Sequence, residues 1–580
     1  MIESVRTFFR NIPKHIWILA LIILVGIFFR MYHFDDWLPF KGDGFRDATL
    51  ISNVYRVGPE GLPLLGPRAA GTMLRLGPAF YHFQYASAVL FDSISAPILA
   101  YPDLFFSILA IPVFYLFSRR YFGIPWALTL SGMLSVSFLA IEYGRFAWNP
   151  NATVFFVLVF SLSVLKVFDA ESPGAPKRRF LWAALAGAAF AIASQLHFSS
   201  FLGLPIVLAA FLLWQWRETR RSLSLQVISF FLATILLIYT PVFMSEYFKH
   251  GENSKRFISA LSSKPSVHGP AENFVEAVKV FANQNARITV GLVYSSKKIL
   301  FFSALFLAVG FLANAFLLRG EQNASKRRFL QWTLLLMGAY FILYLPLAFT
   351  VNRSRFFLPF MMVPYIYCGY IILALEKRFG RHVFLKALAI LGAGIVIMSN
   401  THSVVGWFSE LHQSERVVGA AEMNERNDRG RKSFWLVWTH FDKAATAMDS
   451  ACPGDTPIFF FPSKEIKEYG RSIEYPLLLK NPDRPIILER KYDLETLEGC
   501  YFFVSHTQED TVPESMRSER MDAPLNLGGI LVTQFYPARM SGSYEPDEDD
   551  EKEMTFVPEK RTKNSRVYWG DVVNLITGEK

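Results

Sequence analysis

Long apolar stretches separated by short polar turns dominate the first 400 residues of the chain. A helix that crosses a bilayer needs roughly 20 apolar residues, and about eleven stretches meet that requirement. They cover residues 16–32, 97–118, 123–141, 152–168, 180–197, 199–216, 223–244, 299–318, 329–348, 356–375 and 383–400. The stretch at 78–91 is shorter, so we expect a helix that lies in the membrane interface. The pattern predicts a polytopic α-helical membrane protein.

Basic residues mark one side of this helical array. If the N-terminus is cytoplasmic, the turns that return to that side contain the basic groups at 119–120, 177–179, 217–221, 326–328 and 377–378. Cytoplasmic turns are enriched in lysine and arginine, so this orientation is favoured. We therefore expect a multi-pass plasma (inner) membrane protein with loops 33–96 and 245–298 on the periplasmic or exterior side. The same physics also allows the endoplasmic reticulum.

The C-terminal region has a different pattern. Short apolar runs at 457–461, 485–488, 501–504 and 529–532 are punctuated by proline and glycine, which is typical of strands. We expect a membrane module over residues 1–400 and an extracytoplasmic α/β or α+β domain over 401–580. An oxidising compartment would allow Cys452 and Cys500 to form a disulfide. The alternative is a pair of unpaired buried thiols.

Composition agrees with this interpretation and excludes one class of partner. Hydrophobic residues make up 52% of the 580 residues, and charged residues only 19%. The net charge of +10 comes from basic residues at membrane edges, without a basic and aromatic patch of the kind that binds nucleic acid. We therefore expect the bilayer, and no nucleic acid, among the partners.

Polar residues gather at the outer ends of the predicted helices. The segment 42–48 reads Gly-Asp-Gly-Phe-Arg-Asp-Ala, which places Asp43 and Asp47 on one helical face with Arg46 beside them. A carboxylate at the lipid boundary can act as a base on a substrate held in lipid. The other candidate substrate-binding residues on this side are Tyr81, Glu142, Arg145, Trp148, Asn149, His197, Glu246, Lys249, Arg353 and Arg355.

Several motifs together resemble the GT-C membrane glycosyltransferases over roughly residues 10–400. They are Gly-Asp-x-x-Arg-Asp-Ala at 42–48, Leu-Leu-Gly-Pro at 64–67, Leu-Gly-Pro-x-Phe-Tyr at 76–81, Arg-Arg-x-Phe-Gly at 119–123, Tyr-x-Arg-x-x-Trp-Asn-Pro-Asn at 143–151 and Gln-Leu-His at 195–197. The similarity is to the branch that contains the protein O-mannosyltransferases (glycosyltransferase family 39) and the lipid A aminoarabinose transferases.

The resemblance implies transfer of a sugar from a polyprenyl-phosphate donor to an acceptor hydroxyl on a protein, a lipid or a glycan. Asp43 matches the family's catalytic base, and a single displacement would invert the anomeric centre. Arginines neutralise a phosphate leaving group well, and Arg145, Arg353 and Arg355 are the candidates, with Lys249 and His197 behind them. Tyr81 and Trp148 would support the sugar or the first isoprene units.

One departure from the family concerns a metal. Some relatives have a second acidic residue in the turn where this chain has Asn149. A site for a divalent cation needs several oxygen ligands, so a metal is possible here but is not predicted. No cofactor is expected with certainty.

Two alternatives remain open from the sequence. Many helices with scattered polar groups also fit a transporter or flippase of lipid-linked sugars, although its polar groups would be expected at mid-membrane. A non-catalytic cell-envelope assembly factor fits as well. Individual residues also have structural explanations, since Asp43 could cap a helix, Asp47 could pair with Arg46 or Arg68, and arginines tolerate membrane edges.

Overall fold

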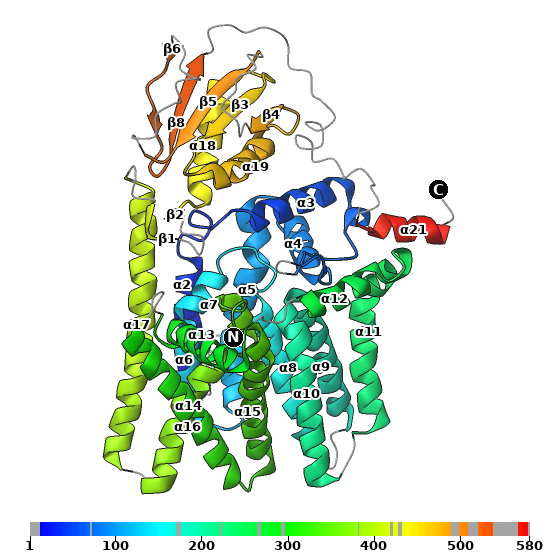
Figure 1. The fold of residues 1–580 in the computed structure, drawn as a ribbon, viewed down its shortest axis with the longest axis vertical. Helices are drawn as coiled ribbons and strands as arrows, with labels where there is room; N and C mark the ends of the chain where they lie inside the picture. The colour runs from blue at the N-terminus through cyan, green and yellow to red at the C-terminus, as the bar shows by residue number, and fades with distance from the viewer. Residues whose placement is uncertain are drawn as a thin grey trace, which may run out of the picture.

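The computed structural model describes residues 12–69, 72–169, 176–220, 223–263, 268–291, 296–380, 382–417, 422–426, 432–488, 498–507, 520–536 and 566–577. A bundle of long helices occupies one end of the molecule, and a mixed sheet with its helices occupies the other (Figure 1). The helices α3 and α4 lie between these two parts. The expected class, a polytopic helical protein with a C-terminal domain of helices and strands, is confirmed.

The long helices form most of the bundle. Their bounds are α2 Lys14–Met31, α5 Ala96–Ser118, α8 Thr153–Asp169, α9 Pro176–Leu196, α10 Phe198–Thr219, α11 Leu225–Phe248, α14 Lys297–Arg319, α15 Ala324–Tyr344, α16 Met362–Phe379 and α17 Val383–Ser414. Shorter pieces complete it: α6 Ile124–Ser135, α7 Phe138–Tyr143, and the 3-10 turns η2 Leu345–Leu347 and η3 Ser354–Phe360. Large apolar side chains on the outside of α11, α14 and α17 are exposed, as lipid-facing residues are.

Among the described residues, eight helices are long and apolar enough to cross a membrane, or nine if η3 and α16, bent by 53°, form one span. The protein is therefore an integral membrane protein, while the count of eleven stays a prediction. The predicted span 123–141 is divided into α6 and α7, because the Ser137 side chain caps a new helix by accepting a hydrogen bond from the Ala140 N–H. Helix α8 is 17 residues long.

The basic turns meet at one end of the bundle. Asp169, at the end of α8, forms ion pairs with Arg120 and Arg328, and Glu218 pairs with Arg327 over 2.8 Å. These contacts join the turns that follow α5, α8 and α10 to the start of α15. The outer loops therefore lie at the opposite end.

The outer helices are α3 Asp43–Val57, α4 Ala79–Leu90, α12 Glu252–Ser263 and α13 Pro270–Val290, with the 3-10 turn η1 Pro59–Gly61. Helix α4 coincides with the interfacial helix predicted at 78–91 and has 12 residues. The two Gly-Pro motifs pack against each other: a Cβ on Gly66 would lie 2.1 Å from the Gly77 carbonyl oxygen. Glycine at these positions permits the close approach of the two chain segments that leads into α4.

The C-terminal domain contains the strands β3 Ile458–Pro462, β4 Ile486–Leu488, β5 Cys500–Ser505, β6 Arg520–Met521, β7 Leu525–Asn526 and β8 Leu531–Tyr536, with helices α18 Trp438–Ala451 and α19 Gly470–Lys480. The order is β4-β3-β5-β8-β6, with β7 also on β8. Strands β3, β4 and β5 are parallel, and β8 is antiparallel to β5. A separate hairpin joins β1 Glu422–Arg426 to β2 Lys432–Phe434.

Four of these strands correspond to the predicted runs, although β8 begins two residues after the run at 529–532. Helix α17 continues to Ser414, past the predicted boundary at residue 400, which stays a prediction. The structure joins Cys452 and Cys500 by a disulfide.

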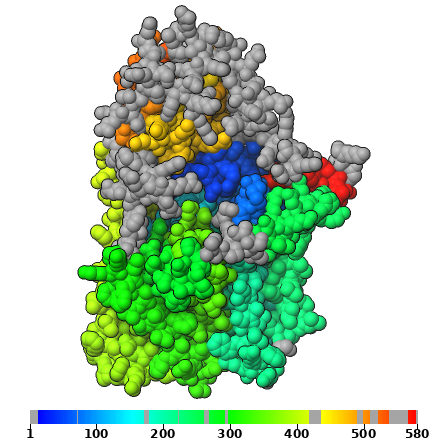
Figure 2. Space-filling view, viewed as in Figure 1, coloured from blue at the N-terminus to red at the C-terminus, as the bar shows by residue number. Residues whose placement is uncertain are grey.

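The first outer loop binds the C-terminal domain to the membrane bundle. The Trp438 N–H donates to the Leu38 carbonyl over 2.9 Å, and the Tyr475 hydroxyl is 2.8 Å from the Ser52 hydroxyl. Figure 2 shows this loop, in blue, at the surface between the C-terminal domain and the helices. These contacts hold α3 in a fixed position at the junction.

A C-terminal strap, which we define as residues 566–577, also returns to this loop. The Leu64 N–H donates to the Val567 carbonyl over 2.8 Å, and the Trp569 N–H donates to the Leu62 carbonyl over 3.0 Å. The strap ends in α21 Trp569–Thr577, and Val567 and Val572 pack on Leu64. Its red helix projects beside the first loop in Figures 1 and 2.

Candidate functional site

A cavity of about 540 Å³ opens at the end of the bundle opposite the basic turns. Its walls come from the start of α3, the loop before α4, the turn between α7 and α8, the α9–α10 junction and the segment before η3. The sequence candidates that line it are Asp43, Arg46, Trp148, Asn149, His197, Arg353 and Arg355. Segments distant in sequence thus converge on one pocket, which we call the outer pocket.

Asp43 is the accessible acid of the outer pocket. It begins α3, and 52% of its side chain is exposed. One carboxylate oxygen accepts a hydrogen bond from Arg46 over 2.8 Å, and the other accepts one from the Trp148 indole N–H over 3.2 Å. These two donors orient the carboxylate while leaving it open to the cavity.

Asp47 lies one helical turn further along α3 and is fully buried behind the pocket. Its two oxygens accept hydrogen bonds from Arg46 over 2.9 and 3.0 Å, and the Tyr81 hydroxyl donates to it over 2.9 Å. Burial raises the pKa of Asp47, and Arg46 opposes that rise. Asp47 and Tyr81 therefore hold Arg46 in place from behind and do not themselves line the cavity.

Positive charge exceeds negative charge in the outer pocket. Among the described residues that line it, Asp43 is the one carboxylate, and Arg46, Arg68, Arg353 and Arg355 are the cations. The Arg355 guanidinium lies 5.1 Å from the centre of the Trp148 ring. Its Nε is buried and has no hydrogen-bond partner among the described residues. A buried donor without a partner, in a cationic pocket, suits an anionic ligand.

His197 and Asn149 shape the floor of the pocket. His197 caps α10, its Nδ1 accepting from the Ser199 N–H over 3.3 Å. Burial, helped by the nearby Arg355, lowers the pKa of His197 to about 3, so the imidazole is neutral at physiological pH. The Asn149 side chain donates to the Leu196 carbonyl over 2.6 Å. Both residues tie the α9–α10 junction to the turn before α8.

The structure places four other sequence candidates away from the outer pocket. Arg145 is buried and donates to the carbonyls of Phe29, Arg30 and His33, which end α2. Glu142 pairs with Arg287 of α13 over 2.7 Å. Glu246 accepts from the Ser254 N–H and hydroxyl in α12. Lys249 follows α11 and is not among the residues that line the cavity.

Three residues near the site were missed from the sequence. Arg68 lines the pocket, and it lies beside a Gly-Pro motif that drew attention only as a turn. Asp103 is buried within α5 and accepts a hydrogen bond from the Trp148 backbone N–H over 3.1 Å. An acidic residue inside an apolar stretch was the available signal for Asp103. Arg566 of the strap lies 5.4 Å from the Tyr81 ring centre, and no local pattern indicated it.

The described residues contain no group of three or more His, Cys, Asp or Glu side chains arranged to hold a metal ion. At the position where some relatives have a second acid, the Asn149 amide nitrogen faces a backbone carbonyl. The pocket is thus formed mainly by arginine and aromatic side chains around one carboxylate.

Two solved structures illustrate the similarity to known proteins. ArnT from Cupriavidus metallidurans, bound to undecaprenyl phosphate, matches with a TM-score of 0.50 and 12% identity over 90% of this chain and 97% of ArnT. The apo oligosaccharyltransferase of Archaeoglobus fulgidus matches with a TM-score of 0.48 and 15% identity over 82% of this chain. The chain spans 64% of the length of that oligosaccharyltransferase.

No protein-family model matches the sequence, and a search of curated proteins finds no match. The structural likeness to ArnT extends over almost the whole of both chains. The fold that the sequence motifs indicated is therefore confirmed, and the chain has the fold of the GT-C glycosyltransferases.

Proposed function

We propose that this protein transfers a sugar from a polyprenyl-phosphate donor to an acceptor hydroxyl at the outer surface of the membrane. The observation that carries the proposal is the outer pocket itself, where the accessible carboxylate of Asp43 faces a group of arginines at one end of a membrane bundle. Sugar transfer from a lipid phosphate needs a base and a cationic site for the leaving group, and both are present.

Asp43 is the base in this proposal. An acceptor hydroxyl is a weak nucleophile, and a positioned carboxylate that removes its proton accelerates such a reaction by roughly 10²–10⁴-fold. The hydrogen bonds from Arg46 and Trp148 fix the carboxylate. Because its side chain stays half exposed, an acceptor can reach it.

Arg355 and Arg353 receive the donor phosphate. The unpartnered Nε of Arg355 supplies a buried donor for a phosphate oxygen, and charge-assisted hydrogen bonds to phosphate are among the strongest that side chains make. The ArnT structure holds undecaprenyl phosphate, and we extend that class of ligand to this pocket. Trp148, which stacks on Arg355, supplies an apolar wall for the sugar or the first isoprene unit.

The reaction is a single displacement. The acceptor oxygen forms a bond to the anomeric carbon as the bond from that carbon to the phosphate oxygen breaks. The hydroxyl proton passes to Asp43, and the leaving electron pair stays on the phosphate, which the arginines neutralise. Attack opposite the leaving group inverts the anomeric centre, so a product with retained configuration would contradict this mechanism.

We propose the exterior or periplasmic face as the location of the outer pocket and the C-terminal domain. The pocket lies at the end of the bundle opposite the paired arginines of the basic turns. Basic turns remain on the cytoplasmic side of the membrane. The N-terminus would then be cytoplasmic, and an acceptor would approach from outside.

The test is transfer by the detergent-purified protein against a panel of polyprenyl-phosphate sugars, read as release of polyprenyl phosphate. Asp43→Asn should lower turnover by roughly 10²–10⁴-fold. Asp36→Asn is a matched control, because its side chain is 55% exposed, lies in the same loop and does not line the pocket. Near-normal turnover of Asp43→Asn would refute the role of Asp43. Movement of lipid-linked sugars across vesicles without any transfer would favour a flippase instead.

A further inference from the structure

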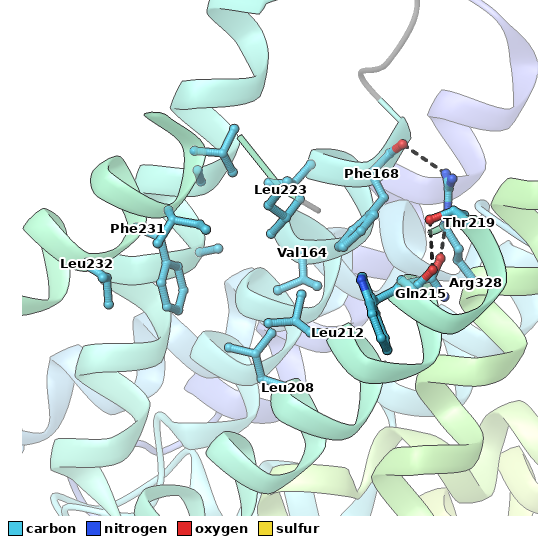
Figure 3. Close-up of a pocket in the computed structure, with 16 residues that line it drawn as sticks. Val164, Phe168, Leu208, Leu212, Gln215, Thr219, Leu223, Phe231, Leu232 and Arg328 are labelled. Atoms are coloured by element: carbon cyan, nitrogen blue, oxygen red, sulfur yellow. Dashed lines mark hydrogen bonds between the residues drawn. The ribbon is translucent and has the colours of Figure 1, made fainter. Parts of the chain in front are cut away.

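A second cavity, of about 400 Å³, lies at the basic end of the bundle. It is enclosed by α8, α9, α10 and α11, and its walls are almost entirely apolar. Val164, Leu208, Leu212 and Phe231 are typical of the lining and point into the space in Figure 3. A cavity of this volume is in the range of small-molecule and lipid-chain sites, roughly 300–1,000 Å³.

This inner cavity is separate from the outer pocket. It shares no lining residue with the outer pocket, and Arg328, which lines it, belongs to the ion pairs of the basic turns. Several of its lining residues, including Ile228 and Leu232, are exposed on the lipid-facing side of α11. Because the walls belong to membrane-spanning helices, hydrocarbon from the surrounding leaflet is the material that can enter the cavity.

Polar groups occur at only one end of the inner cavity. Gln215, Thr219 and Arg328 cluster there in Figure 3. Arg328 is occupied, since it donates to Gln215, to the Phe168 carbonyl and to Asp169. The polar end therefore limits how far a chain extends into the cavity and offers no free charge of its own.

A free cation lies at the rim. The Arg220 guanidinium is 5.3 Å from the ring centre of Trp216, an exposed residue that lines the cavity. Within the part of the chain that the structure describes, no carboxylate forms an ion pair with Arg220, whereas Arg120, Arg327 and Arg328 are all paired. A tryptophan and an arginine at a membrane edge match the headgroup region of a lipid.

From these features we infer that the inner cavity binds one acyl chain of an anionic phospholipid from the leaflet at the basic end, with its phosphate against Arg220. The apolar walls accept the chain, and Trp216 marks the depth of the glycerol and headgroup region. The charge of Arg220 selects an anionic headgroup over a zwitterionic one. This site does not depend on the proposed transferase activity.

Photocrosslinking tests the occupant. The full-length protein in detergent is incubated with phosphatidylglycerol that carries a diazirine at the end of one acyl chain, and labelled peptides are identified by mass spectrometry. We expect label within residues 208–232. Leu212→Trp, which fills the cavity, should remove that label while leaving non-specific label on the lipid-facing side of α14 unchanged. No label on residues 208–232, or equal label in Leu212→Trp, would overturn the inference.

Binding of unmodified lipid tests the headgroup, in case Leu212→Trp fails to fold. Arg220→Gln should weaken binding of phosphatidylglycerol, measured by native mass spectrometry, by about fivefold, since a basic residue at the surface contributes about 1 kcal/mol toward an anionic lipid. Phosphatidylcholine should bind both proteins equally. Arg119→Gln is the matched control, because Arg119 also stacks on an aromatic ring, Tyr115, at 5.6 Å but lies outside the cavity. Equal losses in both variants, or preferential binding of polyprenyl phosphate at the same site, would refute the assignment.

Discussion

The substitution Asp47→Asn separates the structural acid of α3 from the accessible one. Asp47 is fully buried and accepts two hydrogen bonds from Arg46 and one from Tyr81. Asparagine keeps one acceptor oxygen but turns an N–H₂ group toward the Arg46 guanidinium. Losing one charge-assisted hydrogen bond costs about 1.5–3 kcal/mol. Because Arg46 is partly exposed and keeps Asp43, the larger penalty of an unpaired buried charge does not apply in full.

We therefore expect Asp47→Asn to lower the free energy of unfolding by about 2–3 kcal/mol. Asp43→Asn, the same substitution one turn earlier on α3, removes an exposed ion pair and should cost at most about 1 kcal/mol. Thermal unfolding in detergent, followed by intrinsic fluorescence, compares the two variants directly. The midpoint should fall clearly in Asp47→Asn and only slightly in Asp43→Asn.

A double-mutant cycle sharpens this comparison. Tyr81→Phe removes one donor to Asp47 and should cost about 1 kcal/mol in the parent protein. In the Asp47→Asn background that cost should shrink, because the charge that the hydroxyl stabilised is gone. If Asp47→Asn unfolds at the parent's midpoint yet loses transfer more than about tenfold, Asp47 takes part in the chemistry and the structural assignment is wrong.

Four further predictions concern residues around the site. Arg355→Gln should raise the apparent KM for the donor by about tenfold or more with a smaller effect on kcat, since a charge-assisted hydrogen bond to the phosphate is lost, and an equal loss of folding yield and activity would argue for simple anchoring. The pKa of His197 is about 3 when folded and near 6.5 when unfolded, so stability should decrease as pH falls below about 6.5; His197→Gln should remove that part of the pH dependence of the unfolding midpoint. Arg566→Gln should lower stability by about 1 kcal/mol through the lost cation–π contact, whereas Arg566→Lys should retain most of it. Cys452→Ser with Cys500→Ser opens a link between residues 48 apart, and the loop-entropy relation gives a loss of about 4 kcal/mol, measurable as proteolysis of the C-terminal domain.

The sequence was most informative where function depends on local motifs. The segments that contain Asp43, Trp148 and Arg355 were each expected at the outer ends of helices, and in the structure they meet in one pocket. Hydrophobic periods also located the long helices and the runs that became β3, β4 and β5. These features could be predicted because they depend on residues that are near one another in the chain.

Partners that come from distant elements could not be predicted in this way. Glu142 and Arg145 share a turn, yet one pairs with Arg287 on α13 and the other caps α2. Which side chain faces the pocket depends on how α2 and α13 pack against the turn, and a single sequence contains no record of that packing. The break at Ser137 was missed for a related reason, because an apolar window averages over one capping residue.

The strap has a consequence for the order in which the protein is built. Arg566 and Tyr81 are 485 residues apart, and at 5–20 residues per second a ribosome needs roughly 25–100 s to bridge that interval. During this time every motif residue of the outer pocket has already been synthesised, while the support that the strap gives to Tyr81 does not yet exist. The carboxylates of α3 are thus completed in two stages, first within the membrane bundle and much later by a segment that must itself cross the bilayer. A nascent chain interrupted before residue 566 would carry all the motifs of the family and still lack this contact.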